Sequence, residues 1–495
     1  MFTKLMSRSR TSRSSFDSLC VVSRAGLFLA GMACSNGVFA VDRYVDSVGG
    51  VDVVGCIDPL APCQSIAHTI GESGAGDTVR LVSLTGTPNV FLESGLVIPF
   101  ELTISGQGPF QTEIDAQGLN RVFTVTACPV AIDGVTLRNG NAGFTNGGAI
   151  ELLSGDLVVS RSRLLDNTAL VGGAIAAPPG AGDVKLVASV LRDNLATANG
   201  GGIFCDQCTG VYVTLSRLSD NVTAGLGGAI HAFGTTVTTW ASYLSRNNAD
   251  GGGAIFANYA EVNVLDSEFA DNEADSLHGG AIYAGGTLNI QRSALAENFA
   301  AVEGGAVYLA GEGPFVSANS TYSGNEALVG GALSLFANGG AGADVLVGTS
   351  TFFDNESTFA GVAEHIFGAW NTFGLYNSII ANDLNGGLVF DPYCSAPMTA
   401  GQHNLIDDAS CDTGGATFNL GVVTGLDQNL AYNGGMTRTH NLDPASNAVD
   451  GGLNASCLNP ATGAPLSKDQ RAKPRPVDFD GSGLAECDIG AIELQ

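Results

Sequence analysis

The chain has few basic residues, few aromatic side chains and no long apolar run. Lysine and arginine number 21 against 48 aspartates and glutamates in 495 residues, so the formal net charge is −27. Such a field disfavours nucleic acids and anionic membranes as partners and leaves divalent cations and neutral or cationic glycans. No window holds the roughly 20 apolar residues that a membrane-spanning helix needs. We therefore expect no nucleic-acid partner and no transmembrane helix.

The first forty residues have the composition of an export leader. Five bases come first, a short apolar run covers residues 25–33, and a small-residue cleavage site ends at Ala40. This order is typical of a secretory signal peptide, so the mature chain is predicted to begin at Val41 and to be extracellular or at the cell surface. A lipoprotein terminus at Cys34 is the alternative. Removal of residues 1–40 takes away five bases and one acid, which changes the net charge from −27 to −31.

Glycine is abundant, and much of it recurs at a fixed period. The motif Gly-Gly-Ala-Ile or a close variant returns every 25 to 29 residues. Its copies start at Gly147, Gly172, Gly201, Gly227, Gly252, Gly279, Gly304 and Gly330. A glycine pair permits a turn with positive φ and a close approach between neighbouring backbones.

A second motif, an apolar residue three places before an asparagine, keeps step with the first. Its asparagines are Asn167, Asn194, Asn221, Asn247, Asn272, Asn298, Asn325, Asn355 and Asn382. Two motifs in phase indicate a solenoid. Because a side-chain amide both donates and accepts, we expect these asparagines to form a structural ladder that joins successive coils.

The stretches between the motifs alternate apolar and other residues and are bounded by turn formers, as in residues 262–265 and 288–290. This period of two predicts strands. A unit of about 26 residues accommodates three short strands and three turns. Coils stacked about 4.8 Å apart would satisfy each other's backbone. The sequence therefore predicts an all-β protein, a right-handed single-stranded parallel β-helix.

Four segments follow from these patterns. Residues 1–40 are the predicted signal peptide, 41–96 an N-terminal cap, 97–390 the β-helix and 391–495 a loop-rich C-terminal module. Apolar spacing over residues 62–70 predicts a helix in the cap, where it would cover the open end of the first coil.

Nine cysteines follow the leader, and an oxidising compartment would turn most of them into disulfides. Proximity in sequence favours the pairs Cys56–Cys63, Cys205–Cys208, Cys394–Cys411 and Cys457–Cys487, although spacing alone does not fix connectivity. Half of a zinc site is the alternative for Cys205 and Cys208, but no second half is visible. The remaining Cys128 is expected to be a buried thiol that faces a coil interior.

Four ordered blocks in the last seventy residues, 433–440, 443–451, 469–471 and 487–493, resemble the C-terminal module called the choice-of-anchor Q domain. That module usually reads NGGPT and SPAID, so Met436 and Asn447 stand where it has prolines. The glycine and asparagine coils separately resemble the repeats of polymorphic outer membrane proteins, which are displayed on the cell surface. The two resemblances imply an exported β-helix protein of the outer membrane or cell surface.

The residue before each ladder asparagine is usually acidic. In order, these residues are Asp166, Asp193, Asp220, Arg246, Asp271, Glu297, Gly324 and Asp354. In stacked coils their side chains would form one column with about 4.8 Å between neighbours, where like charges repel. The column is either a solvated outer face, which we favour, or a stripe that binds cations.

Residues 478–483 have the spacing of a calcium loop, with oxygen ligands at the first three ligand positions and glycine at the sixth position. The usual glutamate at the twelfth position is replaced by isoleucine, so a nearby acid must substitute. The candidate Ca²⁺ ligands are Asp478, Asp480, Ser482 and Asp488, with Glu486 as a second choice for the last. The alternative is an acidic turn closed by a disulfide.

Two functions fit these patterns. We favour a non-catalytic exported protein, secreted or on the surface, adhesin-like or structural, with an extracellular glycan or a surface protein as partner. The alternative is a polysaccharide-degrading lyase or hydrolase with a pectin-lyase-like fold, which rests on fold analogy. Five histidines of the coils and module lack serine or cysteine partners at diagnostic spacing and are expected in turns or caps: His231, His278, His365, His403 and His440.

Overall fold

The computed structural model describes residues 40–311, 313–336, 343–382, 392–406, 408–412, 421–460, 462–479 and 481–495. Residues 1–39 of the predicted signal peptide, and Asp480 of the predicted calcium loop, lie outside these ranges. Among the described residues, no helix is long and apolar enough to cross a membrane.

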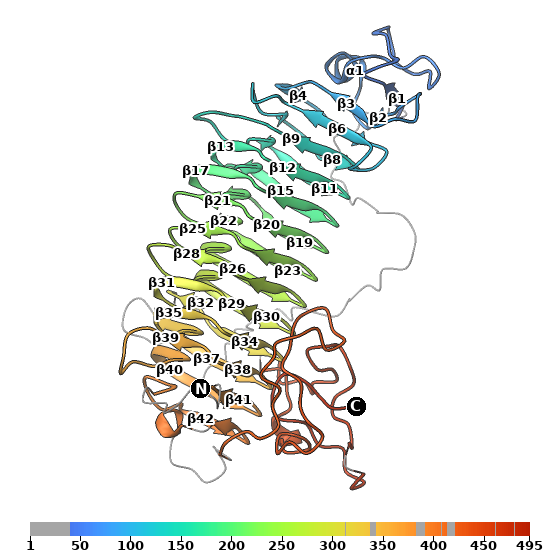
Figure 1. The fold of residues 1–495 in the computed structure, drawn as a ribbon. Helices are drawn as coiled ribbons and strands as arrows, with labels where there is room; N and C mark the ends of the chain where they lie inside the picture. Colours follow the sequence, from blue (N-terminus) through green and yellow to red (C-terminus); the bar gives the residue numbers. More distant parts are fainter. Residues whose placement is uncertain are drawn as a thin grey trace, which may run out of the picture.

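The chain forms a β-solenoid of about 12 turns, with about 27 residues per turn and parallel strand pairing. This confirms the predicted parallel β-helix, with coils slightly longer than the interval of about 26 residues expected from the motifs. Figure 1 shows the coils stacked in chain order, with the N-terminal cap at one end of the stack. Successive coils contribute strands to three sheets, which we name sheets A, B and C.

Most coils contribute two stretches of strand to sheet A. Its strands are β1 (Asp42–Val45), β2 (Asp77–Leu81), β4 (Leu96–Ile98), β5 (Leu102–Ser105), β7 (Phe123–Val125), β8 (Val130–Asp133), β10 (Ile150–Leu152), β11 (Gly155–Ser160), β14 (Ile175–Ala177), β15 (Ala181–Val187), β18 (Ile203–Asp206), β19 (Gly210–Thr214), β22 (Ile230–Phe233), β23 (Thr236–Trp240), β26 (Ile255–Leu265), β29 (Ile282–Gln291), β32 (Val307–Leu309), β33 (Phe315–Ala318), β36 (Leu333–Phe336), β37 (Ala343–Gly348), β40 (Ile366–Tyr376) and β42 (Ala400–Gln402).

Sheets B and C are built from shorter strands. Sheet B contains β3 (Asn89–Phe91), β6 (Thr112–Asp115), β9 (Thr136–Arg138), β12 (Arg163–Leu165), β16 (Val190–Arg192), β20 (Arg217–Ser219), β24 (Tyr243–Ser245), β27 (Glu268–Ala270), β30 (Ala294–Ala296), β34 (Thr321–Ser323), β38 (Thr351–Phe353), β41 (Ile379–Ala381) and β43 (Leu405–Ile406). Sheet C contains β13 (Thr168–Val171), β17 (Leu195–Asn199), β21 (Val222–Thr223), β25 (Asn248–Ala249), β28 (Glu273–Ala274), β31 (Phe299–Glu303), β35 (Glu326–Val329) and β39 (Glu356–Ser357).

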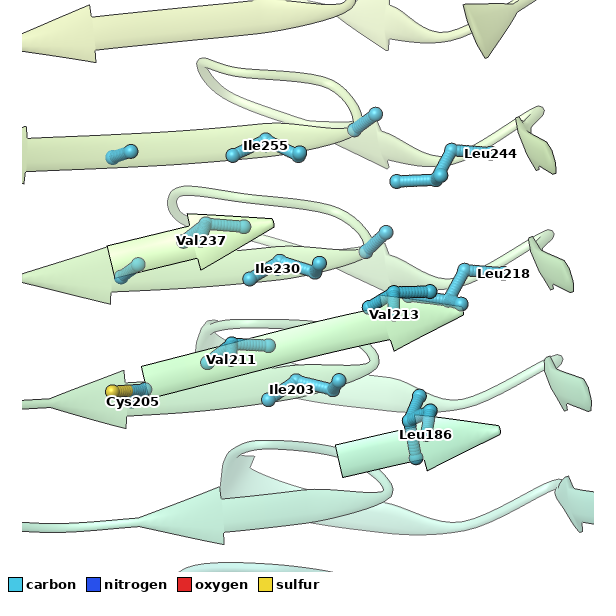
Figure 2. Close-up of a cluster of buried hydrophobic side chains, with 14 of the residues drawn as sticks. Leu186, Ile203, Cys205, Val211, Val213, Leu218, Ile230, Val237, Leu244 and Ile255 are labelled. Atoms are coloured by element: carbon cyan, nitrogen blue, oxygen red, sulfur yellow. The ribbon is translucent and has the colours of Figure 1, made fainter. Parts of the chain in front are cut away.

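The core lies inside the coils and consists of aligned columns of apolar side chains. Ile203 pairs with Ile230, and Ile230 with Ile255, so the three isoleucines stack directly (Figure 2). Alternate residues of each strand point inward, as the burial of Val237 in β23 and Leu244 in β24 shows. The period-two pattern in the sequence is therefore the signature of this interior.

The helix α1 (Ile66–Glu72) covers the N-terminal end of the solenoid, as predicted (Figure 1). Its cap is Ser65, whose hydroxyl accepts a hydrogen bond from the His68 amide. Ile66 and Ile70 are buried beneath it and close the core that the first coil would otherwise expose.

The asparagine ladder is present and fully bonded in the middle of the stack. The side-chain oxygen of Asn272 accepts from both the backbone amide and the Nδ2 of Asn247, at 3.1 and 2.9 Å. Its own Nδ2 donates to Leu244 O and to Asn298 Oδ1, both at 2.9 Å. The predicted structural role of these asparagines is confirmed from Asn167 to Asn355.

The ladder does not continue to Asn382, which corrects the sequence-based register of the last rung. The side chain of Asn355 bonds instead to Nδ1 of the buried His365, at 3.1 Å. Phe353 pairs with Ala381, so Asn382 is aligned with Asp354 and is one residue out of step with the ladder.

A second ladder, made of serines, was missed in the sequence. Each backbone amide donates to the hydroxyl of the serine in the next coil, as Ser242 does to Ser267 at 3.2 Å and Ser267 to Ser293 at 3.1 Å. Its members are Ser162, Ser189, Ser216, Ser242, Ser267, Ser293, Ser320, Ser350 and Ser378. The signal was available, because eight of these serines stand five residues before a ladder asparagine.

The glycine motif forms the expected turn, with a positive φ at its first glycine and a close approach between neighbouring coils at its second. Gly252 has a φ of 60°, and a Cβ on the following Gly253 would lie 2.2 Å from Gly280 O of the next coil. In one coil the positive-φ glycine is Gly200, so the motif there begins one residue earlier than the sequence suggested.

Candidate functional site: the outer face of sheet B

The outer face of sheet B is divided into a covered half and an open half. The C-terminal module does not simply follow the last coil but lies along the side of β30, β34, β38 and β41 (Figure 1). The outward positions of those strands are small or apolar and buried, as in Ala294, Thr321 and Phe353. In β20 and β24 the corresponding positions are Arg217, which is exposed, and Tyr243, which is half-buried.

An apolar cluster holds the module against the covered half. Phe353, Ile379 and Leu405 of sheet B pack with Leu442 and Ile489 of the module, among others. The sequence did not indicate this contact, because the cluster joins residues as far apart in the chain as Phe353 and Ile489.

A buried arginine anchors the same interface. The guanidinium of Arg475 is fully buried and pairs with Glu493 at 2.7 Å. It also donates to Asn319 Oδ1 of the solenoid at 2.7 Å, and to the backbone carbonyls of Asp488, Gly490 and Ile492. These contacts neutralise the buried guanidinium and supply hydrogen-bond acceptors for its N–H groups. They also connect the last residues of the chain to the coils.

Beside the edge of the module that contains Tyr432 and Met436, a groove of about 440 Å³ runs over the open half of sheet B. Its floor is the corner between sheets A and B, where Ala188, Leu215 and Ala241 lie in one column. Arg217 and Tyr243 line one side, and Tyr432 and Met436 of the module close one end. Met436 is one of the two residues that depart from the proline of the resembled module, and it is exposed at this site.

The acidic column before the ladder asparagines has a backbone explanation. Its residues adopt left-handed φ angles, 55° for Asp166, 59° for Asp220 and 55° for Asp271. Aspartate tolerates this conformation better than most residues, because its short side chain bonds locally. Arg246 occupies one position of the column and forms a bidentate pair with Asp220, at 2.7 and 2.8 Å. Arginine therefore offsets part of the repulsion that the sequence predicted.

The predicted calcium ligands occupy different surroundings. Asp478 accepts from the Gly483 amide at 2.9 Å, and its buried Oδ1 has no hydrogen-bond partner in the described part of the chain. Ser482 is exposed. Asp488 is buried, and its two oxygens accept from the amides of Asp450 and Leu494, at 2.8 and 2.6 Å. Burial, followed by the neighbouring carboxylate of Glu493, raises the pKa of Asp488 to about 7.

Calcium titration tests the predicted loop. Binding there should raise the melting temperature, since the ligand stabilises only the folded state, and Asp480→Ala should abolish the shift. Diffuse binding to the acidic surface would survive this substitution but would weaken in moderate salt. Identical calcium shifts for the wild type and Asp480→Ala at moderate salt would leave an ordinary acidic turn.

All four predicted cysteine pairs are disulfides: Cys56–Cys63, Cys205–Cys208, Cys394–Cys411 and Cys457–Cys487. The pairing of Cys205 with Cys208 removes the zinc alternative at those two residues. The prediction for Cys128 was wrong. It is half-buried in a turn with a φ of 64°, and its sulfur is bonded in a disulfide.

One group of three potential metal ligands occurs among the described residues, and its chemistry does not suit a metal. The group consists of Cys56, Cys63 and His68 in the N-terminal cap. Both thiols are oxidised to a disulfide, and Nε2 of His68 lies 2.9 Å from Val53 O. A disulfide has no thiolate to offer a metal.

Three of the histidines are buried, namely His231, His365 and His440, and His231 lies in β22 rather than in the turn or cap expected of it. His231 stacks between Phe204 and Phe256 on the outer side of sheet A, in a row of rings that continues through Tyr283 to Tyr308. These rings face one another along the stack, so they present edges to the solvent and offer no open face to a sugar.

His440 links the module to the solenoid and should make the interface sensitive to acid. One ring nitrogen lies 2.9 Å from Ser323 Oγ and the other 2.8 Å from Asp427 O. Burial lowers the pKa of His440 to about 4, from an ordinary value of 6.5. The stability that the neutral ring supports is therefore complete above pH 6.5 and is lost as the pH falls toward 4.

Between neutral pH and pH 4, His440 should contribute a loss of about 3 kcal/mol in the free energy of unfolding. His440→Gln keeps a donor and an acceptor but cannot be protonated. It should flatten part of this pH dependence, while His231 and His365 keep theirs. Urea unfolding of both proteins across this range measures the difference, and parallel pH profiles would contradict the assignment.

The fold and this flank define a parallel β-helix whose C-terminal module is docked along its own side. No family model matches the chain, and no sequence among the curated proteins matches it.

Proposed function

We propose that this chain is a non-catalytic exported β-helix protein, secreted or displayed at the cell surface, which acts as an adhesin-like or structural rod. The main support is the continuity of the two ladders. From Asn167 to Asn355 each coil supplies the same asparagine rung, and the serine rung recurs beside it. A catalytic site needs several groups that converge away from the repeat, and the repeated side chains already have structural roles.

The groove on sheet B also favours binding over catalysis. Its two carboxylates are Asp266 and Glu268, which are the residues an acid–base pair would need. Asp266 is paired with Arg292 at 2.7 Å, and Glu268 with Arg438 at 2.6 Å. The polysaccharide-degrading alternative therefore has only the analogy of fold in its favour.

Export is supported by three features. The leader pattern ends at Ala40, four disulfides suit an oxidising compartment, and the C-terminal blocks resemble the choice-of-anchor Q domain. The repeats resemble those of polymorphic outer membrane proteins, which is consistent with display on the outer membrane or cell surface.

Expression of the full chain in a secreting bacterial host tests this proposal. The exported protein should begin at Val41 in mass spectrometry, and on a glycan array it should give a stable signal that does not decay with time. Retention in the cytoplasm would contradict export. A signal that disappears as the immobilised glycan is consumed would contradict the non-catalytic role.

A further inference from the structure

Most cations of the described chain are paired with a carboxylate. Of its sixteen lysines and arginines, twelve form ion pairs. Four cations of the described residues have no ion pair. They are two arginines, Arg163 and Arg217, and two lysines, Lys468 and Lys473. In a chain this acidic, cations that are left uncompensated need an explanation.

The two arginines lie in one column of the open half of sheet B. Arg163 pairs in register with Val190, and Val190 with Arg217, so the two guanidinium groups point outward two coils apart. With strands about 4.8 Å apart, this separation is roughly 10 Å. The next residue of the column is Tyr243, which begins the part of the groove that the module closes.

Each of the two guanidinium groups lies over an aromatic ring. Arg163 is 4.8 Å from the ring centre of Phe110, and Arg217 is 5.0 Å from that of Tyr243. Stacking of this kind orients the planar guanidinium and leaves its N–H groups free to bind an anion in a bidentate manner. No hydrogen bond of either guanidinium is present among the described residues, so these donors are available.

The groove that Arg217 lines is compatible with a sugar chain, and Arg163 lies on the same column beyond its lining. Asp266 and Glu268 are paired with other arginines, so Arg217 is the one charged residue of the groove lining without an ion pair in the described part of the chain. The nearby Asp220, which interacts electrostatically with Arg217, is itself paired with Arg246. Leu215 and Tyr432 expose apolar surface beside it, and the groove has room for a few sugar rings. Aromatic and apolar surface with a small number of polar groups is typical of ligand sites.

We propose that this column binds an acidic glycan in which a carboxylate occurs on every second sugar, with one carboxylate on Arg163 and the next on Arg217. The overall charge of the chain disfavours dense polyanions, whereas widely spaced carboxylates match the two isolated cations. The charge of the whole chain favours neutral or cationic glycans, and this column is the local exception. The inference rests on the proposed binding function and assigns its site and ligand class.

The test uses the exported chain with its disulfides intact and a hyaluronan hexasaccharide, in which glucuronate alternates with a neutral sugar. Arg163→Gln and Arg217→Gln should each weaken binding about tenfold in calorimetry, and the double variant should abolish it. Arg192→Gln is the matched control, because Arg192 is exposed on the intervening strand β16 but is paired with Asp193 at 2.7 Å. The affinity of this variant for the hexasaccharide should equal that of the wild type.

Two further ligands complete the test. The methyl-esterified hexasaccharide, which lacks the charges, should bind at least tenfold more weakly, and a homopolymeric uronate of equal length should bind no better. Absence of hyaluronan binding, unchanged affinity in the folded double variant, or equal binding of either comparison ligand would overturn the inference. Export without turnover would still stand in those cases, so the two proposals fail separately.

Discussion

Asn272→Ala is expected to destabilise the solenoid by about 3 kcal/mol, because the substitution leaves several buried polar groups without partners. The alanine removes an acceptor for two donors of Asn247 and a donor to Leu244 O and Asn298 Oδ1. The loss is a difference in the free energy of unfolding, which urea titration of the exported protein measures.

The matched control is Asp271→Asn, one residue earlier. Asp271 is exposed and has a φ of 55°, a conformation that asparagine also tolerates. Partial desolvation of its carboxylate, followed by the neighbouring Glu297, raises the pKa of Asp271, so removal of the charge relieves repulsion. This variant should lie within about 0.5 kcal/mol of the wild type. Similar losses in both variants would mean that the ladder carries no special share of the stability.

Arg475→Met should release the C-terminal module from the solenoid. The substitution leaves the buried carboxylate of Glu493 without its ion-pair partner. It also removes the hydrogen bond from Arg475 to Asn319 Oδ1, which joins the module to the solenoid. Breaking a buried pair in this way typically costs about 3 to 5 kcal/mol. We expect limited proteolysis to remove the module rapidly, while far-ultraviolet circular dichroism of the coils changes little.

Lys473→Met is the control for Arg475→Met. Lys473 is two residues away, carries the same charge and has no ion pair among the described residues. Its substitution should leave the proteolysis rate close to that of the wild type. Equal release in both variants would show that the buried network does not hold the module, and that the apolar cluster around Phe353 and Ile489 does so alone.

Local and periodic features of the fold were predictable from the sequence. The interval between the motifs predicted the length of a coil, and the alternation of apolar residues predicted the strands. The apolar spacing over residues 62–70 predicted the capping helix. Each of these rests on neighbours in sequence or on a repeat, so a single chain contains the information. The four disulfides fall in the same class, because each joins two cysteines that are consecutive in the order of cysteines along the chain.

Features that depend on distant contacts were not predictable in this way. Nothing near Arg475 or His440 in sequence shows that they face Asn319 and Ser323. The groove on sheet B exists only because the module returns along the coils and ends at Tyr432 and Met436. The regular serines had a visible signal that was overlooked, and Asn382 looked like a rung because the coil register changes by one residue.

The candidate arginines illustrate both cases. Their matching positions two coils apart are visible in the sequence once the repeat is aligned. Their lack of carboxylate partners, and the aromatic rings beneath them, depend on Phe110 and Tyr243 in other coils.

We propose that the open flank of this β-helix binds a polysaccharide without cutting it. Chain length is the most direct measure of this claim, because both a lyase and a hydrolase shorten their substrate. Acidic and neutral polysaccharides should be incubated with the exported protein, and their mass distribution followed by size-exclusion chromatography with light scattering. The account predicts an unchanged distribution, with the protein co-eluting with the polymer that it binds. A progressive shift to shorter chains would contradict it.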